Sequence, residues 1–220
     1  MDNEIKSLPM VPLRGMTIMP GMVVHFDVSR ARSIAAVQEA MVEEQKIFLT
    51  AQKSIDAEEP GEADVYETGT VATVRQIIKL PKQIVRVLVS GETRGRLKEI
   101  EFSDPYLRAK IEVLQDSEQD VPEDVNAEAM ERSLKDMLVE YASKNGKMSK
   151  ESVAQLMEIK GLRRLVDEIA ANIPLYYTDQ QEILDETDLK KRYEKLAFKL
   201  VNEVQIMNIK DEIQRKVKER

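Results

Sequence analysis

The chain has 220 residues, a net charge of −7 and no cysteine. This length suits one large domain or two small ones with a substantial core. The acidic charge disfavours a general nucleic-acid binder, and the lack of cysteine excludes disulfides and thiolate metal sites.

Two apolar runs near the N-terminus, residues 8–13 and 22–28, predict two strands. Pro9 and Pro12 keep the first run extended and remove two N–H donors, which is typical of an edge strand or a bulged one. A Pro-Gly pair before the second run is a strong turn signal. The second run alternates apolar and polar residues, which indicates a half-buried strand.

One helix and several strands are predicted next. Ser29 is placed to cap a helix over residues 30–43. Two of the following strands are joined by Leu80-Pro81-Lys82-Gln83, the connection of a hairpin. The predicted strands cover residues 47–52, 70–78, 84–90, 91–102 and 106–114. Together with the N-terminal pair they predict a compact, strongly bent sheet or an open barrel.

A polar linker at residues 115–124 separates this β-rich part from a helical part. Pro122 is expected near the start of a helix, where its missing N–H costs little. That helix ends at Asn145-Gly146, and Ser149 is placed to cap the next one. Two more short helices are predicted over residues 162–171 and 178–184. Their short connections favour a compact helical bundle.

Residues 188–220 contain neither proline nor glycine and predict one long helix. At 1.5 Å per residue it would extend about 50 Å, further than the bundle can cover. Its apolar stripe is expected to pair with another helix. The candidate helix-pairing residues are Leu196, Leu200, Val204, Met207 and Ile213. Because the pattern continues to Arg220, we expect the chain to be a fragment of a longer polypeptide.

The residues supply no motif for catalysis. His25 is the single histidine, and one histidine cannot assemble a usual metal site. No glycine stands in a phosphate-binding loop, so ATP binding is not expected. The acidic loop at residues 56–64 could hold a cation or be a solvated surface loop. The run at residues 93–96 could touch phosphate or form surface ion pairs. We therefore expect no catalytic, cofactor-binding or metal-binding residue here.

Methionines are concentrated at the start of the chain, at positions 1, 10, 16, 19 and 22. Methionine is flexible and polarisable, and it recurs on surfaces that accept many different apolar partners. The candidate substrate-contact residues are therefore Met16, Ile18, Met19 and Met22. The alternative is that this loop folds onto the barrel as ordinary core.

Several segments, in order along nearly the whole chain, resemble the N-terminal domain of the ATP-dependent Lon proteases. They are LPMVPLRGMTIMPGMVVHFDVSR (residues 8–30), IFLTAQK (47–53), EPGEADVYETGTVAT (59–73) and VLVSGETRGR (87–96). The resemblance implies an α+β fold with a PUA-like β pseudo-barrel over residues 1–116. A helical bundle over 117–186 and a long C-terminal helix over 187–220 would follow.

The resemblance also implies a function. This region would recognise protein substrates and organise assembly, while a missing motor would use ATP and Mg and a missing protease module would use a Ser–Lys dyad. The parent would be a cytoplasmic homohexameric ring that degrades misfolded, damaged and short-lived regulatory proteins in quality control and stress. The alternatives are a stand-alone protein-binding adaptor and an RNA-binding PUA-like module, which the acidic charge disfavours. No membrane partner is expected, because the sequence has no long charge-free apolar run and no signal peptide.

Overall fold

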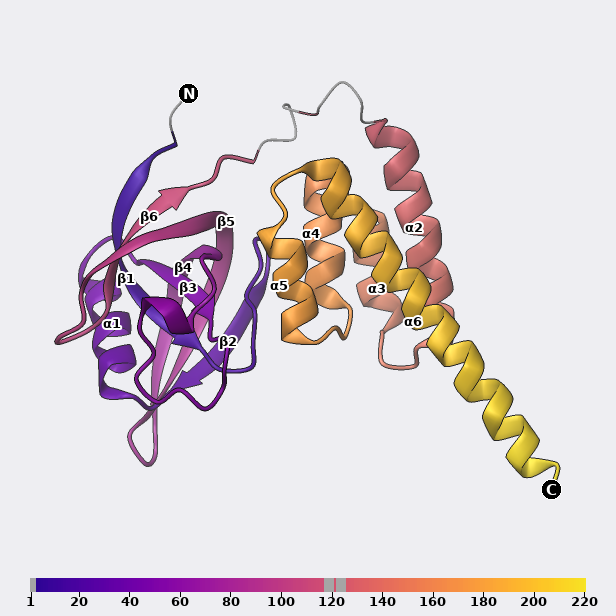
Figure 1. Ribbon diagram of the computed structural model, residues 1–220, viewed down its shortest axis with the longest axis horizontal. Helices are drawn as coiled ribbons and strands as arrows, with labels where there is room; N and C mark the ends of the chain where they lie inside the picture. Colours follow the sequence, from indigo (N-terminus) through magenta and orange to yellow (C-terminus); the bar gives the residue numbers. More distant parts are fainter. Residues whose placement is uncertain (1–2, 117–120, 122–125) are drawn as a thin grey trace. The chain divides into compact units, whose positions relative to one another are not determined.

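The computed structural model describes residues 3–116, 121 and 126–220 (Figure 1). The chain forms two compact units. The first contains the described residues up to Asp116 together with Leu175–Asp185, and the second contains the remaining described residues. Most of the predicted linker at residues 115–124, with Pro122, lies outside the described residues.

The first unit is mainly β-sheet. Its elements are β1 (Ile5–Leu13), β2 (Val23–Val28), α1 (Ala31–Val42), β3 (Lys46–Ala51), the short 3-10 helix η1 (Glu62–Asp64), β4 (Thr68–Leu80), β5 (Ile84–Phe102), β6 (Arg108–Val113) and α5 (Tyr177–Asp185). The strand order is β2-β5-β4-β3-β1-β6, and β6 also pairs with β5. Five strands therefore close into a ring, with β2 attached to β5. This arrangement confirms the predicted α+β fold with a barrel-like sheet.

β5 closes the ring because it is long. The sequence predicts two strands at residues 84–90 and 91–102, but the structure has one strand of 19 residues. The first half of β5 pairs with β2, and its second half pairs with β6. Register shifts interrupt its ladders with β4 and β6. Such irregularities bend a sheet and increase its twist, which allows the closure.

β1 is an interior strand of the sheet, so the edge-strand alternative is wrong. Residues before Met10 pair with β6, and residues from Met10 onward pair with β3. The strand thus changes partner beside Pro9, and Met10 N donates to Leu107 O at 2.9 Å there. Each half of β1 pairs with a neighbouring strand along one side only. Pro9 and Pro12 have no N–H to donate, but at these positions the strand does not need donors toward both sides.

The core of the first unit forms two clusters on the two sides of the bent sheet. The larger cluster contains Ala36, Val37 and Ala40 of α1. The smaller one surrounds Phe48 of β3, whose side chain is fully buried. α1 begins at Ala31 with Arg30 at the N-cap position and no side-chain cap. The predicted Ser29 cap is therefore wrong.

The second unit is a helical bundle of α2 (Ala127–Lys144), α3 (Lys150–Met157), α4 (Leu162–Asn172) and α6 (Leu189–Lys218). Asn126, Ser149 and Asp188 accept hydrogen bonds from first-turn amides and so cap α2, α3 and α6. The Ser149 cap is as predicted. α5 was expected in this bundle, but it belongs to the first unit.

α6 packs against α2 and α4 through the first part of its length. Leu196 and Leu200 are fully buried, and Val204 is nearly so. These three candidate pairing residues therefore have their apolar partners inside the bundle. Met207 is half-buried, and Ile213 is 55% exposed in the part of α6 that extends beyond the other helices (Figure 1). No helix in the described part of the chain is long and apolar enough to span a membrane.

Candidate functional site

The candidate substrate-contact loop lies mostly in the core. Ile18 and Met19 are 2% and 0% exposed, while Met16 and Met22 are half-buried and pack against the larger core cluster. An exposed patch made of all four residues is therefore wrong for Ile18 and Met19. For these two, the alternative of a loop folded onto the barrel describes the structure.

Backbone contacts hold this loop against β4 and β5. Thr70 Oγ1 donates to Ile18 O at 2.7 Å. Gly21 N donates to Gly91 O at 2.9 Å, and Gly91 N donates to Met22 O at 2.8 Å. A Cβ atom at Gly91 would lie 2.3 Å from Met19 O. The loop can approach β5 this closely only because Gly91 has no side chain.

Three polar side chains fix α5 within the same unit. Thr17 Oγ1 donates to Tyr177 O at 2.8 Å, and Gln181 Nε2 donates to Thr68 O at 2.8 Å. Arg94 Nε donates to Leu184 O at 2.9 Å. The last carbonyls of a helix lack intrahelical donors, so the guanidinium completes the end of α5. These contacts explain why α5 belongs to the first unit, with the strands, although its neighbours in the sequence belong to the helical bundle.

Arg94 has neither of the roles considered for the run at residues 93–96. It is 2% exposed, and its Nη1 lies 3.3 Å from Asp116 Oδ2. Arg96, in contrast, lies 3.9 Å from Glu67 at the surface, as expected for a surface ion pair. In a half-buried strand, apolar side chains alternate with polar ones. The neighbours of Arg94 in the sequence do not show this alternation, so nothing in the sequence indicated that the Arg94 side chain is buried.

A hollow of about 580 Å³ opens at the start of α1. Its wall includes three arginines and a buried serine from β1, its following turn and α1, beside apolar side chains. The lining residues of these kinds include Arg14, Arg30, Arg32, Ser33, Pro60 and Leu107. This volume lies within the range of small-ligand sites in proteins.

Arg30 is held rigidly in the wall of this hollow. Its Nη2 donates to Pro12 O and its Nη1 to Gln52 Oε1, both at 2.7 Å, and Nη1 also reaches Glu58 O at 3.5 Å. All three acceptors are neutral oxygens. Burial, and then the nearby charge of Arg14, lower the pKa of Arg30. The guanidinium therefore sits in a partly desolvated position beside a second cation.

A second hollow of about 300 Å³ shares Pro12, Arg14 and Arg30 with the first. It also includes Met16 and the exposed His25. Met16 is thus a candidate contact residue that lines the second hollow. The walls of the two hollows share Arg14 and Arg30 and also contain apolar side chains.

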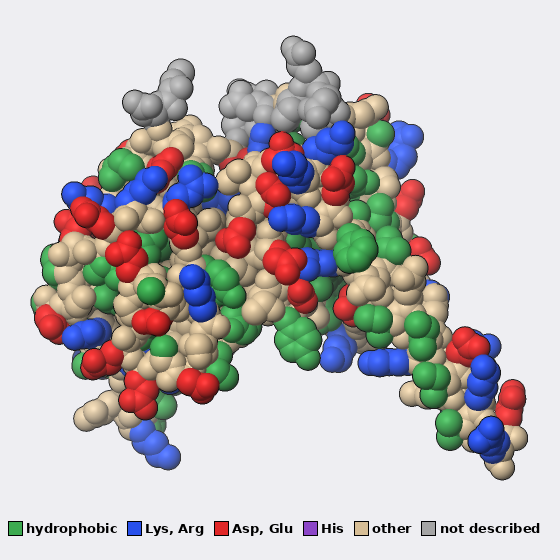
Figure 2. Space-filling model, in the orientation of Figure 1, with side chains coloured by type: hydrophobic (Ala, Val, Ile, Leu, Met, Phe, Trp, Pro, Cys, Tyr) green, Lys and Arg blue, Asp and Glu red, His purple; other side chains and the backbone are tan. Residues whose placement is uncertain are grey.

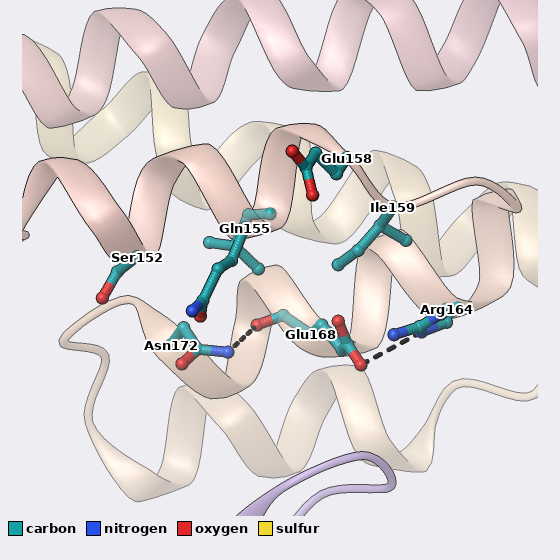
Figure 3. Close-up of a pocket in the computed structure, with 8 residues that line it drawn as sticks. Ser152, Gln155, Glu158, Ile159, Arg164, Glu168 and Asn172 are labelled. Carbon is teal, nitrogen blue, oxygen red and sulfur yellow. Dashed lines mark hydrogen bonds and ion pairs between the residues drawn. The ribbon is translucent and has the colours of Figure 1, made fainter.

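Two other hollows carry polar groups that pair with each other. Between α3 and α4, Arg164 Nε lies 3.1 Å from Glu168 Oε1, and Asn172 Nδ2 donates to Glu168 O at 2.7 Å (Figure 3). Beside β1, Arg108 binds both carboxylate oxygens of Glu43, at 2.7 and 3.2 Å. Their charges are satisfied locally, unlike that of Arg30.

The described residues contain no cluster of three or more histidine, cysteine, aspartate or glutamate side chains that could hold a metal ion. In the acidic loop, Asp64 Oδ2 accepts from Gly61 N at 2.8 Å. Sequence reasoning did not select Arg14, Arg30, Arg32 or Ser33. Arg30, Arg32 and Ser33 lie at the start of α1, and the fold brings Arg14, which follows β1, to the same hollow.

Comparison with known proteins identifies relatives over nearly the whole chain. A family model described as the ATP-dependent protease La (LON) substrate-binding domain matches residues 7–202. The chain is 43% identical to a Lon protease of Clostridioides difficile over 219 residues, which is 99% of this chain and 27% of that protein. It is 36% identical to a Lon protease of Lachnoclostridium phytofermentans, again covering 27% of the relative. The chain thus spans about a quarter of the length of these relatives.

Solved structures support the same fold. The N-terminal domain of a Mycobacterium avium complex Lon protease aligns with a TM-score of 0.70 at 18% identity, covering 91% of this chain and 98% of that one. A Lon N-terminal domain protein from Xanthomonas campestris aligns with a TM-score of 0.59 at 16% identity, covering 87% and 96%.

Proposed function

Because the chain belongs to the family of Lon substrate-binding domains, we propose that it recognises protein substrates for an ATP-dependent protease. The observation that carries this proposal is the family match over residues 7–202. The substrates would be misfolded, damaged or short-lived regulatory proteins in the cytoplasm. Apolar side chains beside the two hollows at Arg14 and Arg30 support binding of exposed, unfolded segments.

The complete protein would supply the chemistry elsewhere in its chain. We propose a motor that uses ATP and Mg and a serine protease module with a Ser–Lys dyad, since the relatives are Lon proteases about four times longer than the matched region. The chain by itself should neither hydrolyse ATP nor cleave protein.

Assembly into a homohexameric ring would use the far part of α6. Ile209, Ile213 and Val217 are 57%, 55% and 69% exposed there. Figure 2 shows hydrophobic side chains along this part of the helix. Together with Ile206, which is 38% exposed, these residues recur at spacings of three and four residues, which is typical of helices that pair. Sedimentation of the wild type and of an Ile209→Ser, Ile213→Ser variant should show weaker self-association of the variant.

A binding experiment tests substrate recognition. The chain is titrated into labelled α-lactalbumin that has been reduced and carbamidomethylated, so that it stays unfolded without added carboxylates. We expect saturable binding by fluorescence anisotropy, whereas native α-lactalbumin with its disulfides should not bind. Failure to bind the unfolded form, with the chain shown to be folded by circular dichroism, would contradict the proposal.

A further inference from the structure

The N-terminus of α1 presents unused hydrogen-bond donors. Ile34 N donates to Arg30 O at 3.0 Å and begins the helical ladder. The amides of Ala31, Arg32 and Ser33 precede that bond and so lack intrahelical acceptors. Arg30 provides no side-chain cap, and no acidic residue lies in the first turn. The helix dipole adds partial positive charge at this end, so the position favours an anion.

Ser33 gives a second, independent indication. The residue is only 4% exposed, and its side chain forms part of the wall of the 580 Å³ hollow. Its hydroxyl is not among the fully enclosed side-chain atoms that lack a partner in the described part of the chain, so it is open to the hollow. A hydroxyl donates readily to an acceptor oxygen, which a ligand in the hollow would supply.

The arginines supply the charge. Arg30 has only neutral acceptors and lies close to Arg14, and both side chains line the hollow. Arg32 is already paired, since its Nη2 lies 3.1 Å from Asp104 Oδ1. A single anionic group between Arg14 and Arg30 would relieve their mutual repulsion and form charge-assisted hydrogen bonds.

The rest of the wall indicates which anion fits. Glu58 and Glu59 also line the hollow, and they would repel a doubly charged phosphate more than a singly charged carboxylate. Pro105 is exposed in the wall of the hollow, and the largely buried Pro60 and Leu107 add apolar atoms to it. A residue that carries both a carboxylate and an apolar side chain matches this combination. The last residue of a polypeptide has both.

We propose that this hollow binds the C-terminal carboxylate of a protein substrate, with the amides of the first turn of α1, Ser33, Arg14 and Arg30 as its donors. This inference rests on the proposed function, because it names the part of a substrate that the chain recognises. The apolar side chain of the last substrate residue would lie against Pro60 and Leu107. Preceding residues could then extend along the hollow that Met16 borders.

The test compares two short peptides of one sequence, labelled at the N-terminus and ending in leucine, one with a free carboxylate and one with a C-terminal amide. We expect the free acid to bind at least about tenfold more tightly, as for a charge-assisted contact. Arg14→Gln and Ser33→Ala should each weaken binding of the acid by about three- to tenfold and leave binding of the amide unchanged.

Arg75→Gln is the matched control, because Arg75 is exposed on β4, binds Ser90 and does not line the hollow. It should leave both affinities unchanged. Ser33→Ala removes a hydroxyl without a partner, so it should retain the wild-type melting temperature. Arg14 is exposed, so its substitution should also leave the fold intact.

Three results would overturn the inference. Equal affinity for acid and amide, while unfolded α-lactalbumin still binds, would contradict the carboxylate site and leave the proposed function standing. Displacement of the acid by inorganic phosphate, but not by chloride at equal ionic strength, would indicate a general oxyanion site instead. A folded chain that binds neither peptide nor unfolded α-lactalbumin would contradict the proposed function itself.

Discussion

At the scale of single residues, close backbone contacts decide where the methionine loop lies. Met16 to Met22 would suit a flexible capture surface by composition. The hydrogen bonds of Gly21 and Gly91 instead draw its backbone onto β5. Ile18 and Met19 then become core residues, and Thr17 becomes a contact for α5.

The first prediction concerns Gly91. Gly91→Ala would place a Cβ atom 2.3 Å from Met19 O, so the loop must move away from β5. We expect the free energy of unfolding to fall by about 1 to 3 kcal/mol, as for other overpacked positions. Gly146→Ala is the control, because nothing lies within 4 Å of its Cβ position. It should change stability by less than about 0.5 kcal/mol in urea unfolding. Equal effects of the two changes would show that the loop is not packed closely on β5.

The second prediction concerns pH. The hydrogen bonds from Arg108 lower the pKa of Glu43 below its ordinary value of 4.5. A carboxylate with a lowered pKa in the folded state contributes stability above its unfolded pKa, and the contribution is lost as the pH falls through the lowered value. Glu43→Gln should therefore cost up to about 1 kcal/mol near neutral pH, and this cost should shrink as the pH falls below 4.5. Urea unfolding of both proteins across this range measures the difference. A cost that does not depend on pH would contradict the ion-pair explanation.

At the scale of elements, α5 shows how polar contacts assign a helix to a unit. Its own sequence predicts only a short amphipathic helix next to other helices. Arg94 of β5 binds the end of α5, Gln181 binds its middle to β4, and Thr17 of the loop after β1 binds its start. Such buried, directional contacts specify position more strictly than an apolar face does.

The third prediction follows from these contacts. Arg94→Met keeps the apolar length of the side chain but removes the donors to Ile183 O and Leu184 O and the pairing with Asp116. We expect a loss of about 3 to 5 kcal/mol, because buried acceptors lose their charged partner. Hydrogen exchange should show faster exchange across residues 177–185.

Arg96→Met is the control for this change, since Arg96 forms only a long surface ion pair. It should cost less than about 1 kcal/mol. Unchanged protection of α5 in the Arg94 variant would mean that apolar packing alone holds this helix.

At the scale of the whole molecule, the chain consists of two units, each with its own core. Separate cores allow each unit to lose structure without the other. The fourth prediction uses Leu200, which is fully buried in the bundle. Leu200→Asp should cost several kcal/mol, because it buries a carboxylate without a partner. Hydrogen exchange should accelerate in α2 and α6 while β4 and β5 keep their protection. Simultaneous loss of protection in both units would indicate one cooperative structure.

The sequence by itself determined the family of this protein and most of its elements, although β5 was predicted as two strands. Alternating runs predicted the strands, the hairpin at Pro81 is where it was expected, and the stretch free of proline and glycine predicted α6. These signals are local, since periodicity and turn chemistry depend on neighbouring residues. The resemblance to Lon proteases likewise came from segments that can be compared residue by residue, and the family match confirms it.

Only the tertiary structure decided which residues are buried, which unit holds α5 and which side chains share a hollow. Ile18 and Met19 have the same local pattern whether they are exposed or buried, and the contact with Gly91 spans about seventy positions of the chain. Arg14 follows β1, whereas Arg30 and Ser33 lie at the start of α1, so their common hollow exists only once β1 and α1 pack together. Burial and convergence depend on partners distant in sequence, so no local pattern encodes them.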